Sequence, residues 1–256
     1  MADNRFKRLV HAGHPQYGLF CVSNALQTAE ALAHSGLDFI VFDAEHSPQS
    51  LPHLHAQLAA LAGAPIASIV RVAGLDITAF KQCLDLGADA LMVPNIENAD
   101  EARTAVSYTR YPPEGVRGVG GTMRVTRYGR DKGYFASASE RCCLIVQIES
   151  RQALAQLDEI CVVPGVDMVF FGPADLSVDM GYMGQPSHPE VVKAIEDGIR
   201  LAQGLGMASG VLAVEPECAR YVEAGATAVI LGSDLGLMVR AADTLAQQYV
   251  RPQPSI

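Results

Sequence analysis

The sequence predicts an α/β fold, a single (β/α)8 TIM barrel that takes in residues 1–256. A length of 256 residues is ordinary for one such barrel, which needs about 250. Eight short apolar runs, rich in Val, Ile and Phe, are each followed by a helical pattern. The runs are apolar on both faces, as strands of a parallel sheet are when helices cover both of its sides.

The predicted strands and helices alternate along the chain. The strands are expected at 17–22, 38–43, 66–71, 89–94, 143–149, 166–172, 207–213 and 227–232. The helices are expected at 25–35, 51–62, 76–86, 99–108, 151–160, 189–205, 216–224 and 235–249. Three helices are followed by a glycine, Gly36, Gly87 or Gly225, where a left-handed residue closes the last turn. Such repeats predict a barrel or a doubly wound sheet, and eight of them favour the barrel.

A glycine-rich segment at 110–140 interrupts this rhythm. A loop of that length inside a compact domain is usually functional or an oligomer contact. Its glycine run at 117–121 could suggest a phosphate cradle, but the lysine and the spacing of a P-loop are missing.

The composition argues against several classes of partner. The net charge is −9 with no run of Lys or Arg, which argues against nucleic acid. No apolar stretch reaches the ~18 residues of a transmembrane helix, and the first residues lack the apolar region of a signal peptide. The six cysteines form no CxxC pair, so we expect buried thiols and a cytoplasmic protein without a membrane partner. Charged residues make up only 18% of the chain, which predicts that subunits of a homo-oligomer cover part of its surface.

Polar side chains are expected at one rim of the barrel, where the strands end and active sites of this fold lie. They are His46, Arg71, Gln147, Glu149 and Asp175. Glu149 and Asp175 come from neighbouring strand ends. Two carboxylates, completed by water and substrate oxygens, suit a hard ion such as Mg²⁺ or Mn²⁺. They do not suit a zinc site made of His and Cys.

Each of these charged residues also has a plainer interpretation. Asp175 and Glu149 could be helix caps. His46 could belong to a solvated loop. Arg71 ends a buried strand, where an unpaired charge is costly, so a structural ion pair is the alternative to a catalytic role.

Four stretches of the chain resemble a known family, the class II pyruvate aldolases of the HpcH/HpaI type (the 4-hydroxy-2-oxoheptanedioate aldolase family). They are Phe-Asp-Ala-Glu-His at 42–46, Tyr-Pro-Pro-Glu-Gly-Val-Arg-Gly at 111–118, Val-Gln-Ile-Glu-Ser at 146–150 and Phe-Gly-Pro-Ala-Asp-Leu-Ser at 171–177. The likeness runs from about residue 18 to residue 249, and the last two stretches at this spacing are highly specific.

The resemblance implies how the substrate and a metal would be bound. Glu149 and Asp175 would ligate a divalent ion, Mg²⁺, Mn²⁺ or Co²⁺. Gln147 and the backbone at Ala174, together with Asp175, would hold the pyruvate part of the substrate.

The resemblance also implies three catalytic residues. His46 would be the general base, Arg71 would stabilise the charge of the enolate, and Asp85 would raise the basicity of the histidine. Asp85 is expected at the end of the helix at 76–86, toward the barrel end opposite the active site. Either this residue comes from a neighbouring subunit, or the helix boundary is different, or Asp85 merely caps the helix.

The implied reaction is the reversible retro-aldol cleavage of a 4-hydroxy-2-oxo acid to pyruvate, or a related 2-oxo acid, and an aldehyde through a metal-held enolate. The family likeness also implies a homohexamer, a trimer of dimers, that acts on small molecules. The chain departs from the family pattern at Phe20 and 21–24, where many relatives have a tryptophan and a small-residue run, and at 122–127. Both loops should face the aldehyde half of the substrate.

Three other functions compete with this one. A class I aldolase needs a Schiff-base lysine at a strand end, and Lys7, Lys81, Lys132 and Lys193 all fall elsewhere. An acyl-CoA lyase of the citrate lyase β type shares a barrel with metal-binding carboxylates, but a basic patch for nucleotide phosphates is missing here. A non-catalytic barrel that binds 2-oxo acids would require lost ligands, yet the whole set is present.

Overall fold

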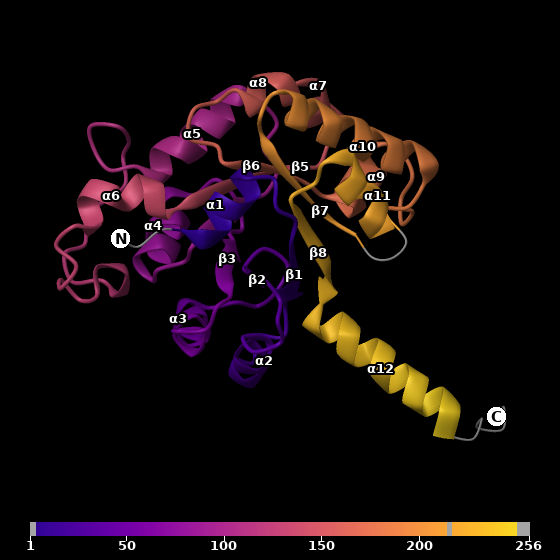
Figure 1. Cartoon of the computed structure of the whole chain (residues 1–256), viewed down its shortest axis with the longest axis horizontal. Coiled ribbons are helices and arrows are strands. Elements are labelled where there is room, and N and C mark those ends of the chain that lie inside the picture. Colours follow the sequence, from indigo (N-terminus) through magenta and orange to yellow (C-terminus); the bar gives the residue numbers. More distant parts are fainter. Residues whose placement is uncertain (1–3, 214–216, 250–256) are drawn as a thin grey trace.

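The computed structural model describes residues 4–213 and 217–249, which form one closed barrel of eight parallel strands (Figure 1). The strands are β1 (Gln16–Cys21), β2 (Phe39–Asp43), β3 (Ala67–Arg71), β4 (Ala90–Val93), β5 (Cys143–Ile148), β6 (Met168–Phe171), β7 (Ala208–Leu212) and β8 (Ala228–Ser233). Each strand pairs with the next along the chain, and β8 closes the barrel on β1. The predicted fold is confirmed; seven strands begin and end within one residue of the expected positions, and β6 begins two residues later than expected.

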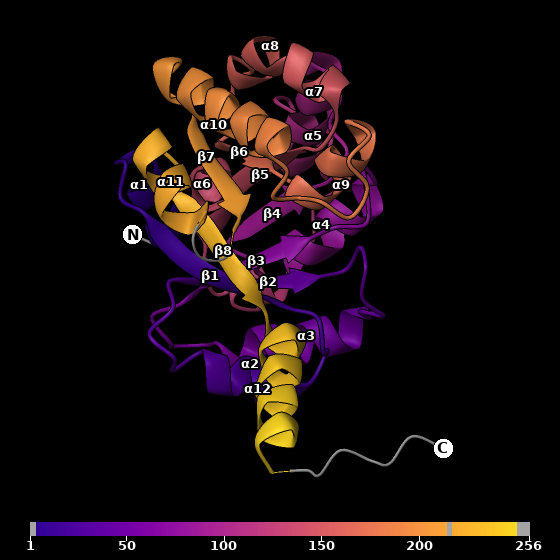
Figure 2. The ribbon, with the colours of Figure 1, turned by 90° about the vertical axis from the view of Figure 1, so that its right-hand side faces the viewer.

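Helices surround the barrel (Figures 1 and 2). They are α1 (Arg5–His11), α2 (Leu26–Leu32), α3 (Leu51–Ala60), α4 (Ile77–Asp85), α5 (Ala99–Thr109), α6 (Tyr134–Arg141), α7 (Arg151–Ala155), α8 (Leu157–Cys161), α9 (Pro173–Asp179), α10 (Pro189–Gly204), α11 (Glu217–Ala224) and α12 (Asp234–Tyr249), with a 3₁₀ turn, η1, at Arg124–Thr126. The helix expected at 151–160 is divided at Gln156, and Pro216, the expected first residue of α11, lies outside the described residues. Within the described ranges, no helix is both long and apolar enough to cross a membrane.

The barrel interior is apolar, because successive side chains of a strand point to opposite faces and alternate residues point inward. The inward-facing strand residues include Phe20, Phe39, Val41, Ile69, Met92, Ile145, Phe170 and Ile230. Helix α1 closes the amino-terminal end, where Phe6 packs edge-on against Phe39 with ring centroids 5.2 Å apart. The same alternation turns Asp43, Arg71 and Gln147 inward at the carboxyl-terminal end, two positions beyond an apolar interior residue in each strand.

The 110–140 segment is fastened to two helices by Arg124. Its guanidinium donates from Nη1 to the carbonyl of Leu86 at 2.7 Å and from Nη2 to the carbonyl of Leu58 at 2.9 Å. These carbonyls end α4 and α3, and a cation is favourable at a helix carboxyl terminus. Sequence patterns did not reveal η1 and α6 within this segment, because η1 spans only three residues and α6 buries only Tyr134 and Ala138.

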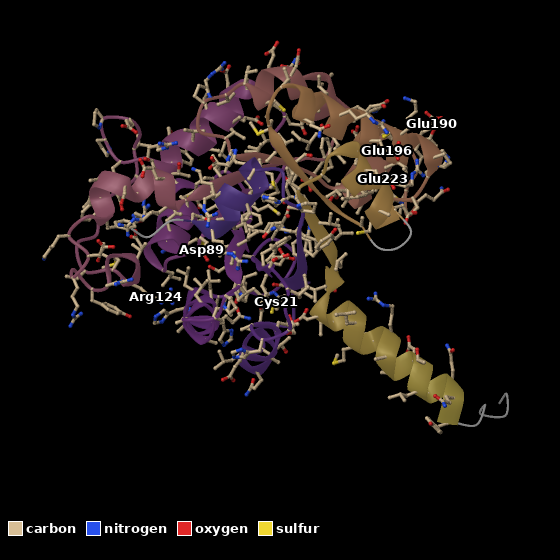
Figure 3. All side chains as sticks on the ribbon, viewed as in Figure 1. Cys21, Asp89, Arg124, Glu190, Glu196 and Glu223 are labelled. Carbon is tan, nitrogen blue, oxygen red and sulfur yellow. The ribbon has the colours of Figure 1, made fainter. Side chains whose placement is uncertain are left out.

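Helix α12 leaves the barrel at the end of β8 and projects away from it (Figures 1 and 2). The carboxylate of Asp234 fixes the start of this helix, since it accepts from the N–H groups of Val22 at 2.9 Å and Ser23 at 3.2 Å. Figure 3 shows Cys21 beside the same junction, with its Sγ 3.5 Å from Oδ2 of Asp234. The large apolar side chains exposed along the helix are Leu235, Leu237, Met238, Val239, Leu245 and Tyr249. The described chain therefore orients α12 but does not cover it.

Candidate active site at the carboxyl-terminal end of the barrel

An ion pair between neighbouring strands lies at the centre of the rim. Asp43 ends β2 and lies opposite Arg71, the last residue of β3. Arg71 donates from Nε to Oδ1 of Asp43 at 2.9 Å and from Nη2 to Oδ2 at 2.8 Å. Burial opposes the ionisation of Asp43, but these hydrogen bonds and the charge of Arg71 outweigh it and lower the pKa of the carboxyl group. The sequence alone left a structural ion pair as the alternative to a catalytic role for Arg71. This ion pair is present, and it holds the guanidinium in place.

Glu45 lies between Arg71 and His46. Its Oε2 is 3.3 Å from Nη1 of Arg71 and 3.5 Å from Nε2 of His46, and this buried oxygen has no hydrogen-bond partner among the described residues. Burial raises the pKa of Glu45, although the charges of Arg71 and His46 act in the opposite direction. The His46 side chain is 61% exposed, so its imidazole is open to the barrel mouth. Sequence reasoning missed Glu45, whose only signal was its position between Asp43 and His46.

Glu149 is buried and lies beside Gln147. Gln147 donates from Nε2 to Oε1 of Glu149 at 2.6 Å, and the N–H of Asn95 donates to Oε2 at 3.1 Å. Burial raises the pKa of Glu149 to about 7; the hydrogen bond from Asn95 opposes this shift, and the nearby carboxylates of Asp175 and Glu45 add to it. The sequence predicted both Gln147 and Glu149 at this rim, and the structure brings them together.

The turn after β6 carries the second predicted metal ligand. Gly172 is the N-cap of α9, and Ala174 and Asp175 are exposed in its first turn. A side chain at position 172 would place its Cβ 2.5 Å from Oε1 of Glu149, so glycine leaves the space that Glu149 occupies. The charge of Asp175 acts on both Glu149 and Glu45, which shows that the carboxylates share one rim.

The carboxylates of this rim fit a divalent cation. Glu149, Asp175 and Glu45 repel one another, and the nearby Arg71 is already bonded to Asp43. Like charges at a partly buried site are costly unless a cation neutralises them, and carboxylate oxygens are the ligands that Mg²⁺ and Mn²⁺ prefer. Among residues 4–213 and 217–249, no three His, Cys, Asp or Glu side chains are grouped as a metal site. Water and substrate oxygens would therefore complete the coordination.

Asp85 is not part of this rim. It is the last residue of α4, which returns the chain to the amino-terminal end of the barrel before β4. There Arg117 donates from Nη2 to Oδ1 of Asp85 at 2.7 Å. The expected helix boundary is correct within one residue, so a misplaced helix end does not explain the position of Asp85. Within one chain, Asp85 and His46 lie at opposite ends of the barrel.

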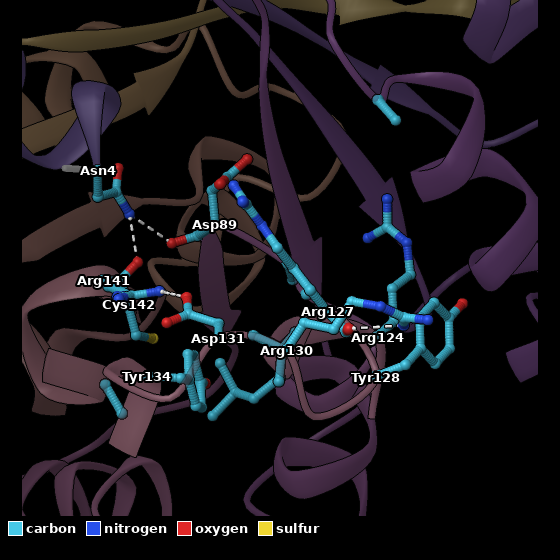
Figure 4. Close-up of a pocket in the computed structure, with 16 residues that line it drawn as sticks. Asn4, Asp89, Arg124, Arg127, Tyr128, Arg130, Asp131, Tyr134, Arg141 and Cys142 are labelled. Carbon is cyan, nitrogen blue, oxygen red and sulfur yellow. Dashed lines mark hydrogen bonds and ion pairs between the residues drawn. The ribbon is translucent and has the colours of Figure 1, made fainter. Parts of the chain in front are cut away.

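A cavity of about 600 Å³ also lies at the amino-terminal end (Figure 4). The arginines that line it are Arg124, Arg127, Arg130 and Arg141. At its edge the side chain of Asn4 donates to the carbonyls of Asp89 at 2.7 Å and Arg141 at 2.9 Å. None of the rim residues lines this cavity, so it is separate from the site described above.

Comparison with known proteins assigns the chain to a family. Residues 16–241 match the family model described as HpcH/HpaI aldolase/citrate lyase. The chain belongs to this family. It is 45% identical over 249 residues to a protein named 4-hydroxy-2-oxo-heptane-1,7-dioate aldolase from Shigella sonnei, which covers 96% of this chain and 95% of that protein.

Solved structures show the same relationship for this aldolase. A crystal structure of an HpcH/HpaI aldolase/citrate lyase family protein from Burkholderia cenocepacia gives a TM-score of 0.91 at 36% identity, over 96% of this chain and 98% of that one. An HpcH/HpaI aldolase from Desulfitobacterium hafniense gives 0.86 at 28% identity, over 98% of each chain. The family and the class of enzyme predicted from the sequence, an aldolase, are confirmed.

Replacing Glu149 with Gln should change how the stability of the metal-free aldolase depends on pH. The pKa of Glu149 is raised from 4.5 to about 7, so its contribution to stability is fully present below pH 4.5 and is lost as the pH rises through about 7. Glu149→Gln has no such loss and should gain in Tm relative to the parent across this range. Thermal unfolding in the presence of a chelator, at several pH values, measures the Tm of both proteins. A Tm difference that does not vary with pH would contradict the raised pKa of Glu149.

Alanine at position 172 should weaken metal binding. Its Cβ would lie 2.5 Å from Oε1 of Glu149, so the carboxylate must move. Disturbing the support of a ligand typically costs about 10- to 100-fold in metal affinity. Titration calorimetry with Mn²⁺ measures this for Gly172→Ala against Gly204→Ala, a control position with no atom within 4 Å of the added Cβ. Equal affinities for the two variants would show that Gly172 does not position a ligand.

Proposed function

We propose that this aldolase uses a divalent metal to cleave 4-hydroxy-2-oxo acids reversibly into pyruvate, or a related 2-oxo acid, and an aldehyde. The observation that carries the proposal is the rim itself, where the paired carboxylates of Glu149 and Asp175 share the barrel mouth with an immobilised Arg71. The name of the Shigella sonnei relative supports the same substrate class. Residues 1–256 would act as one catalytic domain, and six free thiols fit the cytoplasm predicted from the sequence.

Glu149 and Asp175 would hold the metal, which we propose is Mg²⁺, Mn²⁺ or Co²⁺. A bound divalent ion withdraws charge from the 2-oxo group as a Lewis acid. Gln147, which contacts Glu149, and the backbone at Ala174, next to Asp175, would bind the oxygens of the pyruvate part. Together these residues would fix the bond between C3 and C4 of the substrate relative to Arg71.

Arg71 would stabilise the negative charge that develops on the 2-oxo oxygen as the C3–C4 bond breaks. Its guanidinium makes two hydrogen bonds to Asp43 and lies 4.5 Å from the centroid of the Phe20 ring. A donor that is already oriented where charge develops needs little reorganisation, which is the main advantage of such groups in catalysis.

His46 would accept the proton of the 4-hydroxyl group. As this proton leaves, the O–H electron pair forms the aldehyde carbonyl, and the C3–C4 pair passes into the 2-oxo group. A proton delivered to C3 then gives pyruvate. The exposed imidazole at the barrel mouth suits this role, because a histidine exchanges protons near neutral pH.

We also propose that the enzyme assembles as a homohexamer, a trimer of dimers. Helix α12 supports assembly, because Asp234 orients it away from its own barrel while its apolar side chains stay exposed. A second copy of the chain would cover these side chains. Assembly would also allow Asp85 of one subunit to approach His46 of another and raise its basicity, which no single barrel permits.

Metal dependence is the experiment that tests the proposed function. Release of pyruvate from 4-hydroxy-2-oxoheptanedioate should stop after chelation and return with Mg²⁺, Mn²⁺ or Co²⁺. The four lysines lie on α1, α4, α10 and the turn before α6, away from the strand ends. Borohydride with pyruvate should therefore leave the protein unmodified, and a lysine adduct would indicate class I chemistry instead.

Two substitutions should separate the roles of His46 and Arg71. His46→Ala should lower aldol cleavage by a factor of ~10² or more, as removal of a general base does. It should keep a larger share of oxaloacetate decarboxylation, since oxaloacetate has no 4-hydroxyl. Arg71→Ala should depress both reactions, by about 3 kcal/mol of transition-state stabilisation. Arg71→Lys should restore activity only in part, because an ammonium lacks the guanidinium fork.

The control is circular dichroism of each variant, since Arg71→Ala also leaves the buried Asp43 unpaired. Equal losses of both reactions in His46→Ala would place the histidine at the enolate instead, and Asp43 would then be the first base to test.

Light scattering should show an assembly several times the 27.2 kDa of one chain. Charged side chains on α12, in the double variant Met238→Glu and Leu245→Glu, should dissociate it, because both residues are more than half exposed and apolar. Gln247→Glu on the same helix is the matched control and should leave the mass unchanged. A stable parent monomer at micromolar concentration would exclude the hexamer and any action of Asp85 between subunits.

A further inference from the structure

Arg117 is a buried cation in the 110–140 segment. Its side chain is 0% exposed, and it donates from Nη2 to Oδ1 of Asp85 at 2.7 Å and from Nη1 to the hydroxyl of Tyr134 at 3.2 Å. The guanidinium also lies over the ring of Tyr111, 4.6 Å from its centroid. Taking a charge out of water is costly unless close partners repay it. These contacts hold the guanidinium in one orientation, with Asp85 as its ion-pair partner.

One oxygen of Asp85 is bound and the other is left available. Arg117 binds Oδ1, while Oδ2 points toward Gly120, where an added Cβ would lie 3.6 Å from it. The Asp85 side chain is 16% exposed, and the neighbouring Val119 is 68% exposed. The carboxylate is therefore held in a fixed direction and is still partly accessible at the molecular surface.

We propose that Arg117 is the positioning residue for Asp85: it holds Oδ1 so that Oδ2 accepts a hydrogen bond from the imidazole of His46 in a second copy of the chain. This inference rests on the proposed role of Asp85. A histidine ring oriented by a fixed carboxylate is the usual arrangement of a catalytic base.

A purely structural role for Arg117 would be to fasten the 110–140 segment to α4. Arg124 already provides this attachment, since its guanidinium bonds the carbonyls of Leu86 and Leu58 near the ends of α4 and α3. The two roles predict different kinetics. If Arg117 only attaches the segment to α4, its loss should lower the rates of both cleavage and decarboxylation. If Arg117 positions Asp85, its loss should lower the rate of cleavage, the reaction that needs His46 as a base.

The experiment compares Arg117→Lys, Asp85→Asn and the double variant in the metal-loaded, full-length enzyme. Lysine keeps the charge but not the fork that binds one carboxylate oxygen in a fixed direction. Arg124→Lys is the matched control, since Arg124 belongs to the same segment and does not contact Asp85. Tyr134→Phe is a milder second variant that removes only the hydroxyl beside Nη1, in case Arg117→Lys does not fold. Light scattering first confirms equal assembly.

Cleavage of 4-hydroxy-2-oxoheptanedioate and decarboxylation of oxaloacetate are followed across pH. Asp85→Asn should lower kcat for cleavage about 10²-fold and shift the acid limb of the cleavage profile to lower pH, because His46 loses a carboxylate partner. Arg117→Lys should lower kcat about 10-fold, with a smaller shift in the same direction. Glu45, which contacts His46 within its own chain, and Arg71, which contacts Glu45, are unchanged in every variant. Decarboxylation should be largely retained, and the double variant should be no worse than Asp85→Asn.

The outcomes distinguish this inference from the proposed function. If Asp85→Asn lowers cleavage but Arg117→Lys and Tyr134→Phe behave like Arg124→Lys, Arg117 does not position Asp85. Equal loss of both reactions in Arg117→Lys without a shift of the acid limb, or additive losses in the double variant, would also overturn the inference. If Asp85→Asn changes neither the rate nor the limb, the proposed role of Asp85 is wrong, and the inference fails with it while the metal-dependent reaction stands.

Discussion

The candidate active site depends on one buried carboxylate, that of Asp43. Only 1% of this residue is exposed, so its charge is tolerable only because Arg71 binds both of its oxygens. Oδ1 also accepts from the N–H groups of Glu45 at 3.0 Å and His46 at 3.3 Å. One carboxylate therefore orients both the guanidinium and the turn that carries the imidazole. The register of β2 against β3, which sets Asp43 opposite Arg71, makes this possible.

The rim around this pair has more negative than positive charge. Glu45, Glu149 and Asp175 act on one another, and Arg71 lies among them. Burial and mutual repulsion explain why the pKa values of Glu45 and Glu149 are raised while that of Asp43, with two bonds to Arg71, is lowered. The same imbalance makes the rim suitable for a divalent cation, because Arg71 is the single guanidinium shared by Asp43 and Glu45 and forms no ion pair with Glu149 or Asp175 among the described residues.

A single barrel leaves two features incomplete. Helix α12 is fixed at its start by Asp234 but exposes its apolar side chains, and Asp85 is held rigidly by Arg117 at the end of the barrel away from His46. In the proposed assembly, a second copy of the chain would cover α12 and would bring Asp85 to His46. In that assembly, Arg117 of the 110–140 segment would hold Asp85 at the end of α4 in a fixed direction.

The sequence by itself determined the fold and the composition of the rim. Eight apolar runs separated by helical patterns located seven strands within one residue at each end and β6 within two, because strands covered on both sides need continuous apolar stretches. The ends of those strands in turn located His46, Arg71, Gln147 and Glu149. The short elements α1 and η1 were missed: η1 spans three residues, and α1 has only two buried apolar residues, Phe6 and Val10, and depends on contacts such as Phe6 with Phe39.

Only the tertiary structure decided which partner each charge has. Asp43 binds Arg71 because two strands are in register, Glu45 lies between Arg71 and His46 because a turn folds over the rim, and Arg117 reaches Asp85 from thirty-two residues away. It also decided that α12 projects away from the barrel, although its sequence is that of an ordinary amphipathic helix. Local patterns record whether a side chain is buried. Pairing between charges depends on distances between segments that no local pattern contains.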